Sequence, residues 1–193
     1  AALTKDAPLV FSIALSGDDY EERITRAYEH GATHIRLGSF PFEYDEFMPD
    51  NSDPYPNWSQ GNFALFRVFP PEGIAEHIPA GLIERNRAFL DSRMDVIRRL
   101  GLRIIINGSE PLWLPESVYA AHPRWRGVQC ELGRIAAKPY WSPSIDEPEV
   151  LELYREATRR LCERYPEIDR LSFWTNDCGA GLPWSTYSYP GVN

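Results

Sequence analysis

The sequence lacks several features that would place it in whole classes of protein. No apolar run approaches the roughly 20 residues needed to cross a bilayer, and the chain does not open with a basic segment followed by an apolar stretch. Lys and Arg total 20 against 28 Asp and Glu, and the net charge of −8 disfavours nucleic acid, whose recognition relies on clustered cations. We therefore expect no membrane segment and no nucleic-acid partner.

Cysteine is also scarce, and the common metal and cofactor motifs are missing. Cys130, Cys162 and Cys178 form no CxxC pair, which disfavours a disulfide framework and structural zinc. The four histidines form no HExxH motif, and the glycines near Gly179 do not match GxGxxG. We predict neither a metal nor a cofactor.

What the sequence does contain is an alternation of apolar runs with helical patterns. Hydrophobic residues make up 43% and aromatic residues 13%, enough for one compact core. Apolar spacing of three and four predicts helices, and short runs rich in β-branched residues predict buried parallel strands. The expected helices are 20–30, 82–100 and 148–165, and the expected strands are 8–15, 33–40, 102–107 and 168–175.

This order predicts an α/β fold with a parallel sheet and right-handed crossovers. No helix is expected after the fourth strand, and uncovered parallel edges are rare. We therefore favour a (β/α)8 TIM-type barrel, with residues 1–193 as its N-terminal half, about four β/α units, continued beyond this chain. A self-sufficient doubly wound domain is the alternative. Residues 41–79 are expected to form an elaborated aromatic loop within the half-barrel.

Ligands of parallel α/β folds bind beyond the carboxyl ends of the strands, and two carboxylates follow such ends here. Glu110 follows the third expected strand and Asp177 the fourth. Glycosidic cleavage uses an acid to protonate the leaving oxygen and a second group to activate water or attack the sugar. Both residues are candidate catalytic groups, although Asp177 next to Gly179 also suits a turn and Glu110 before Pro111 also suits a solvent-facing turn.

Residues around these carboxylates are of types that bind sugars. Aromatic rings form platforms for the apolar faces of pyranose rings, and amide groups hydrogen-bond to hydroxyls. Arg36 either forms an internal ion pair or binds a substrate carboxylate in bidentate fashion. The candidate substrate-binding residues are Asn107, Asn176, Trp113, Trp174, Trp184 and Arg36.

Residues 107–181 resemble the catalytic barrel of bacterial proteins related to α-glucuronidases and β-hexosaminidases. The resemblance rests on the segment His122-Pro123-Arg124-Trp125, a Ser/Pro-rich turn at 141–144 that introduces a helix, and an acidic residue, Asp177, at the end of the fourth strand. It implies a glycoside hydrolase with Asp177 as general acid or as part of the acidic pair. The sequence departs from the hexosaminidase pattern at Cys178, where that family has Glu.

These observations predict a hydrolase of carbohydrate metabolism that takes part in polysaccharide degradation. A carbohydrate is the expected substrate, and the remainder of the barrel, from the same or another chain, is the expected partner. The alternatives are a non-catalytic carbohydrate-binding protein on the same barrel and a lyase or isomerase. The chain begins at Ala1 rather than Met, which fits a secreted protein, extracellular or periplasmic, or a piece of a longer one.

Overall fold

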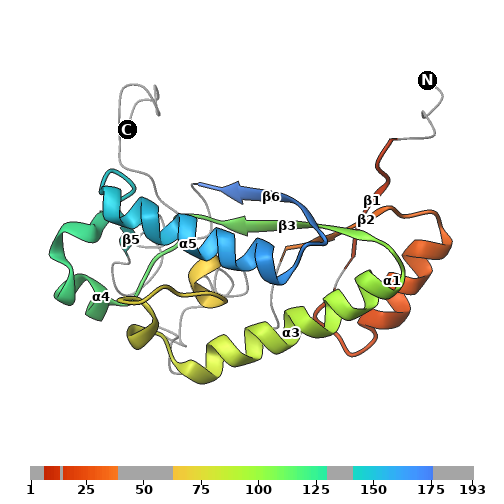
Figure 1. Ribbon diagram of the computed structural model, residues 1–193, viewed down its shortest axis with the longest axis horizontal. Helices are drawn as coiled ribbons and strands as arrows, with labels where there is room; N and C mark the ends of the chain where they lie inside the picture. The colour runs from red at the N-terminus through yellow and green to blue at the C-terminus, as the bar shows by residue number, and fades with distance from the viewer. Residues whose placement is uncertain (1–6, 14, 39–62, 130–140, 176–193) are drawn as a thin grey trace.

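The computed structural model describes residues 7–13, 15–38, 63–129 and 141–175. Its centre is a four-stranded parallel sheet with the order β1-β2-β3-β6 (Figure 1). The strands are β1 (Val10–Ser12), β2 (His34–Leu37), β3 (Arg103–Ser109) and β6 (Ile168–Trp174). All four predicted strands are present, and the first two are shorter than the sequence predicted.

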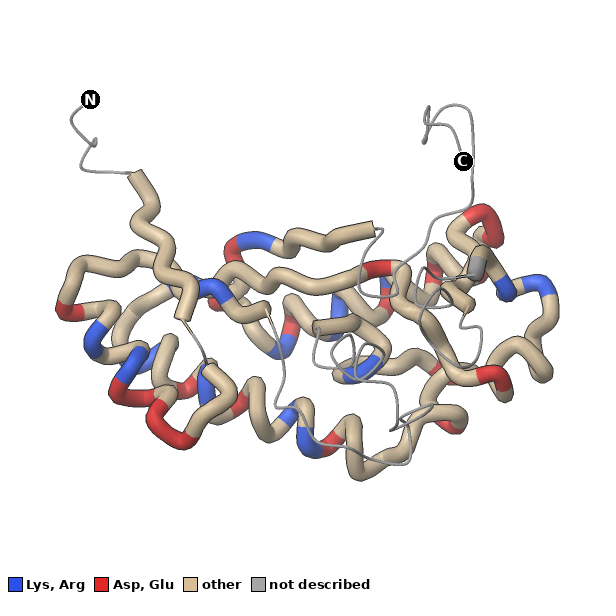
Figure 2. Tube along the Cα trace, turned by 180° about the vertical axis from the view of Figure 1, so that it is seen from behind, with Lys and Arg blue, Asp and Glu red and all other residues tan. Residues whose placement is uncertain are grey.

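Three helices connect the strands, and Figures 1 and 2 show them together on one side of the sheet. They are α1 (Tyr20–Glu29), α3 (Ala80–Arg99) and α5 (Pro148–Arg164), each close to its predicted range. The strand order follows the chain without a reversal, whereas a doubly wound sheet reverses its order and carries helices on both faces. The predicted α/β class is therefore confirmed, with helices on a single face, and the closed barrel stays a prediction.

Burial in the central strands shows which face of the sheet is covered. Alternate side chains of β2 and β3 point toward the helices, and these four are at most 1% exposed: Ile35, Leu37, Ile104 and Ile106. The side chains between them, including Arg36, Ile105 and Asn107, are only half-buried. We call the side away from the helices the open face. No described residue covers it as the helices cover the other face.

The longest helix, α3, follows directly from its sequence pattern. Ile83, Leu90, Met94 and Ile97 recur along one side and are buried. The helix ends before Gly101, which has a φ of 67° that side chains with a Cβ rarely adopt. Its opposite side carries charged residues, so the helix packs on the sheet and remains hydrated on its outer surface.

The described part of the predicted aromatic loop, residues 63–79, is irregular and largely buried. Phe63, Ala64, Leu65, Phe66, Val68 and Phe69 are at most 7% exposed. The segment includes two short 3-10 helices, η1 (Leu65–Arg67) and η2 (Ala75–His77). Many aromatic residues without a helical or alternating pattern suggested a loop, yet the same residues provide the apolar area that buries this irregular segment beneath α5.

At its start, segment 63–79 lies against the sheet, where the backbone of Phe63 comes close to that of Gly108. The Phe63 N–H donates to Gly38 O at 3.4 Å, and the Ser109 N–H donates to Phe63 O at 3.1 Å. Phe63 thus lies between the ends of β2 and β3 and pairs with Gly108. A Cβ on Gly108 would overlap the carbonyl oxygen of Phe63, so only glycine fits there.

Replacing Gly108 with Ala is therefore expected to lower the free energy of unfolding by about 2 kcal/mol, because the added carbon forces the two backbones apart. Urea denaturation of both proteins measures the change. Gly81→Ala is the matched control, since a Cβ at Gly81 in the first turn of α3 meets no atom within 4 Å. Equal stability of Gly108→Ala and the wild type would contradict the close approach.

A small second sheet was not predicted. Strand β4 (Arg126–Gln129) pairs antiparallel with β5 (Trp141–Pro143), next to helix α4 (Glu116–Ala121) and the 3-10 helix η3 (Pro123–Trp125). Residues 141–143, predicted as part of a Ser/Pro-rich turn, therefore form a strand, because β4 offers them a pairing edge. Within the described ranges, no helix is both long and apolar enough to span a membrane.

Candidate functional site

The carboxyl ends of β3 and β6 are joined by a backbone hydrogen bond. The Glu110 N–H, directly after β3, donates to the carbonyl oxygen of Trp174, the last residue of β6, at 2.9 Å. Strands β3 and β6 therefore end side by side at the same edge of the sheet. Asp177 is the third residue after Trp174 in the sequence. We call this region the carboxyl-end edge.

The Glu110 carboxyl group is buried and hydrogen-bonded on both oxygens. Oε1 accepts from the Leu65 N–H at 2.6 Å, while Oε2 accepts from the Leu112 N–H at 3.1 Å and from the Tyr154 hydroxyl at 3.1 Å. The residue is 8% exposed. These bonds tie together the end of β3, the start of η1 and helix α5.

Burial raises the pKa of the Glu110 carboxyl from 4.5 to about 7. The two backbone N–H groups, the Tyr154 hydroxyl and the positive charge of Arg67 act in the opposite direction, since they favour the ionised form. Glu110 also borders a cavity of about 10 Å³, enough for about one water molecule and far too small for a sugar. The group can exchange a proton near neutral pH, but it does not face a substrate-sized cleft among the described residues.

This position differs from the predicted one. The sequence placed Glu110 in a solvent-facing turn or at the mouth of a cleft, and the structure turns it beneath the sheet edge toward α5. The reason is the surrounding set of donors: an irregular backbone leaves N–H groups at Leu65 and Leu112 that need an acceptor once buried. We interpret Glu110 as an anchor of the carboxyl-end edge.

Trp113 is likewise a core residue, and the prediction that it forms an exposed sugar platform is corrected. Its side chain is 3% exposed, and the Arg67 guanidinium lies over its ring at 5.3 Å. The run Leu112-Trp113-Leu114 lines the small cavity beside Glu110. The sequence suggested that the ring of Trp113 would lie on the surface, whereas the apolar run that follows β3 packs into the core.

Three predicted substrate-binding residues belong to the sheet side away from the helices. Arg36 and Asn107 are half-buried on the open face of β2 and β3. Trp174 is 51% exposed, and by strand alternation it shares the open face with Ser172 and Arg170. The structure thus brings Arg36, Asn107 and Trp174 to one face, separate from the buried Glu110 carboxyl.

Asn176, Asp177 and Trp184 lie outside the described residues. Among the residues described, no three His, Cys, Asp or Glu side chains gather as metal ligands would.

Sequence reasoning missed Arg67 and Tyr154, which surround Glu110. Arg67 is 4% exposed within the apolar run 63–69, and a lone charge in such a run signals a buried polar contact. Tyr154 follows Val150 by four residues and precedes Ala157 by three, so helical spacing places it beside the buried stripe of α5. Its ring stacks on Phe66 with centroids 4.4 Å apart.

No protein-family model and no curated protein matches this sequence. Among solved structures the chain is similar to the β-galactosidase of the psychrophilic Marinomonas ef1, at 16% identity and a TM-score of 0.43, over 86% of this chain and 21% of that one. It is also similar to an α-galactosidase from Lactobacillus brevis, at 11% identity and a TM-score of 0.48, over 96% of this chain and 22% of that one. An α-amylase from Lactobacillus plantarum matches at 12% identity and a TM-score of 0.45, over 86% of this chain and 44% of that one.

The chain thus spans less than half the length of each of these three glycoside hydrolases. Similarities of this size identify neither a family nor an activity for this chain.

Proposed function

We propose that this chain supplies the first four β/α units of a (β/α)8 barrel that hydrolyses glycosidic bonds. In this proposal, Asp177 is the general acid, and the second catalytic carboxylate comes from the remainder of the barrel. A carbohydrate binds at the carboxyl-end edge. A secreted, extracellular or periplasmic location belongs to the same proposal.

The observation that carries the proposal is the hydrogen bond between Glu110 N and Trp174 O, which joins the ends of β3 and β6. It brings the end of β6, three residues before Asp177 in the sequence, to the edge where ligands of parallel α/β folds bind. The exposed Trp174 ring and the half-buried Asn107 lie on the adjoining open face. An indole and an amide are the groups expected of a sugar site.

A general acid at Asp177 would act by proton transfer. It would give its proton to the glycosidic oxygen as the bond to the anomeric carbon breaks, and the second carboxylate would attack that carbon or activate water. Trp174, Asn107, Asn176 and Trp184 would hold the sugar ring. Glu110 would keep the edge rigid, which matters because small displacements of a catalytic group cost large factors in rate.

A non-catalytic carbohydrate-binding protein is the second candidate, and one observation favours it. Glu110, the only carboxylate described directly after β3, has both oxygens bound by internal donors and is not free to act on a ligand. A protein with that arrangement and no second carboxylate would retain the aromatic and polar face and bind sugars without cleaving them.

Parallel assays of cleavage and affinity separate the two candidates. The full protein is incubated with a panel of plant, algal and host glycans, and new reducing ends and binding constants are both measured. The hydrolase proposal expects new reducing ends on at least one glycan that binds. Binding without any new reducing end would support the binding protein and contradict hydrolysis.

A further inference from the structure

The buried Glu110 carboxyl group lies where three chain segments of the carboxyl-end edge meet. The Glu110 N–H is bonded to Trp174 O at the end of β6, and Oε1 of the side chain accepts from the Leu65 N–H at the start of η1. The segment that leads into η1 begins at Phe63, whose N–H donates to Gly38 O just past the end of β2. A change in the charge of this one group therefore acts on the backbone beyond β2, β3 and β6 together.

Among the described groups bonded to the Glu110 carboxyl group, only the Tyr154 hydroxyl can accept a proton from it. The Leu65 and Leu112 partners are backbone N–H groups, which donate and cannot accept, whereas a hydroxyl does either. The neutral carboxyl group therefore has its proton on Oε2 and donates it to the Tyr154 hydroxyl oxygen. On ionisation this bond reverses, and the hydroxyl becomes the donor.

The groups that act on the charge of Glu110 come from both neighbouring elements. Burial has the largest effect and raises the pKa to about 7, while Arg67 of η1 and the Tyr154 hydroxyl of α5 favour the ionised form. The other residues that line the small cavity beside Glu110 carry no charge: Ala64, Phe66, Ile78, Leu112, Trp113 and Leu114. The ionised and neutral forms are therefore both populated near neutral pH.

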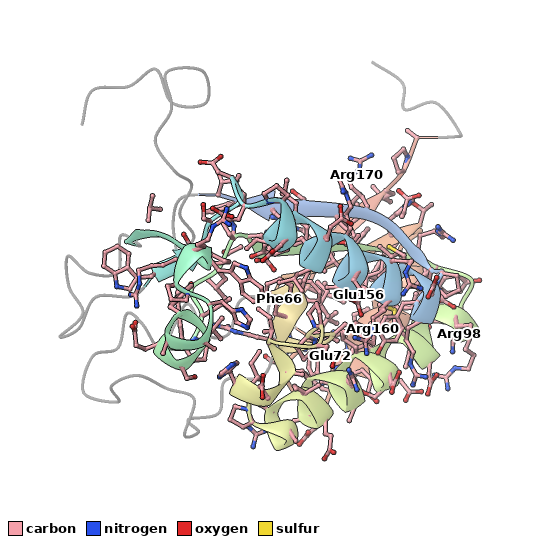
Figure 3. The ribbon with its side chains drawn as sticks, turned by 60° about the vertical axis from the view of Figure 1, so that its left-hand side comes forward. Phe66, Glu72, Arg98, Glu156, Arg160 and Arg170 are labelled. Carbon is pink, nitrogen blue, oxygen red and sulfur yellow. The ribbon has the colours of Figure 1, made fainter. Side chains whose placement is uncertain are left out.

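Tyr154 connects the buried carboxyl group with solvent on the helix side of the sheet. It is half-buried and borders an open groove of about 440 Å³ whose other lining residues belong to the same helix, α5. Its ring stacks on that of Phe66 with centroids 4.4 Å apart, and Figure 3 shows Phe66 beneath α5. A proton can therefore reach Glu110 without crossing the edge where a sugar would bind.

The two forms of Glu110 hold the edge with different strength. Hydrogen bonds to an ionised acceptor are about twice as strong as those to a neutral one, so ionisation strengthens the bonds from the Leu65 and Leu112 N–H groups. The fold as a whole loses stability on ionisation because the charge is buried, whereas these local bonds become stronger. The backbone of the edge is therefore better ordered when Glu110 is ionised.

We propose that Glu110 and Tyr154 form a proton switch that controls carbohydrate binding at the carboxyl-end edge. The ionised form holds the edge in its binding arrangement, and protonation weakens that hold. Sugar binding therefore releases protons, and the affinity increases as the pH rises. The inference rests on the proposed carbohydrate site and adds to it a regulation that does not involve the general acid.

Nuclear magnetic resonance of the full protein tests the switch without a ligand. Leucine labelled with heavy nitrogen reports on both backbone donors, because the amide signal of a donor follows the charge of its acceptor. The Leu65 and Leu112 signals are expected to move together between about pH 5 and pH 9, with a midpoint near 7, while the signal of Leu90, buried in α3, stays in place. In Glu110→Gln neither signal moves.

Two tyrosine variants make the result specific. Tyr154→Phe removes a hydrogen bond that favours the ionised form, so the midpoint moves to higher pH. Tyr165→Phe is the matched control, since it removes a hydroxyl that donates to Asp91 at 3.1 Å, before the start of β6, and leaves the midpoint unchanged. Wild-type signals that do not move, signals that still move in Glu110→Gln, or an unchanged midpoint in Tyr154→Phe would overturn the switch.

Affinity at different pH then tests control of the site. The dissociation constant of a neutral glycan is measured in the full protein with Asp177→Asn, so that neither turnover nor titration of the proposed general acid contributes. It is expected to fall about fivefold from about pH 6 to pH 8, and adding Glu110→Gln removes this change. An affinity independent of pH would overturn the regulation. Absence of cleavage by the wild type, with both pH dependences intact, would contradict only the proposed hydrolysis.

Discussion

Asp177→Asn in the full protein is expected to lower the turnover of a cleavable glycan by roughly a hundred- to ten-thousand-fold. An amide cannot give a proton to the leaving oxygen, whereas it has nearly the shape of the carboxyl group and keeps most hydrogen bonds to the unreacted sugar. Affinity should therefore change by only a few-fold. Steady-state kinetics and equilibrium binding of the same glycan measure the two effects.

Asp169→Asn is the matched control for this variant. Asp169 lies near the opposite end of the same strand, β6. Its side chain is 42% exposed, and its Oδ2 atom lies 3.5 Å from Nε2 of His34. Its substitution should leave turnover unchanged. Turnover of Asp177→Asn within a few-fold of the wild type would remove Asp177 from the mechanism, because Asn also serves well in a turn.

Glu110→Ala is expected to lower the free energy of unfolding by about 3 kcal/mol or more. The Leu65 N–H, the Leu112 N–H and the Tyr154 hydroxyl would all lose their acceptor in a buried place, and the removed carboxyl group would leave an enlarged cavity. Urea denaturation at pH 5 provides the comparison. Tyr154→Phe, which removes one of the three donors, should cost only about 1 kcal/mol.

Full stability of Glu110→Ala would contradict the anchoring role. It would mean that the three donors have water or another acceptor available, and Glu110 would return as a candidate catalytic group.

The same carboxyl group should make stability depend on pH in a defined direction. Its pKa rises from 4.5 to about 7 on folding because of burial, so between these values the folded state binds more protons than the unfolded state. The contribution of Glu110 to stability is therefore fully present below pH 4.5 and is lost as the pH rises through about 7, by on the order of 3 kcal/mol. Glu110→Gln should remove this dependence, and an unchanged profile in that variant would contradict the assignment.

The regular elements could be predicted because each has a local cause in the sequence. Helix α3 has an apolar stripe and a glycine stop, and β3 has an uninterrupted run of isoleucines. Their order along the chain then led to a parallel sheet with crossover helices. The ends of β3 and β6 were predicted within two residues, and the expected parallel order placed these two ends next to one another.

The direction in which Glu110 and Trp113 point could not be predicted. It depends on segment 63–71, whose fold follows from packing between β3 and α5 and not from local periodicity. The strand β5 was missed for the same reason, since three residues form a strand only when β4 lies alongside. The faces of Arg36 and Arg170 required the register of three strands, which no single segment encodes.

Product analysis in water labelled with heavy oxygen tests the central claim, hydrolysis of a glycosidic bond, most directly. The full protein is incubated with a glycan that it binds, and the products are examined by mass spectrometry. Hydrolysis predicts heavy oxygen in the product, because water supplies the new hydroxyl group. Products that lack heavy oxygen and contain an unsaturated sugar would show a lyase, and an intact glycan at full binding would show a binding protein; either result would contradict the account.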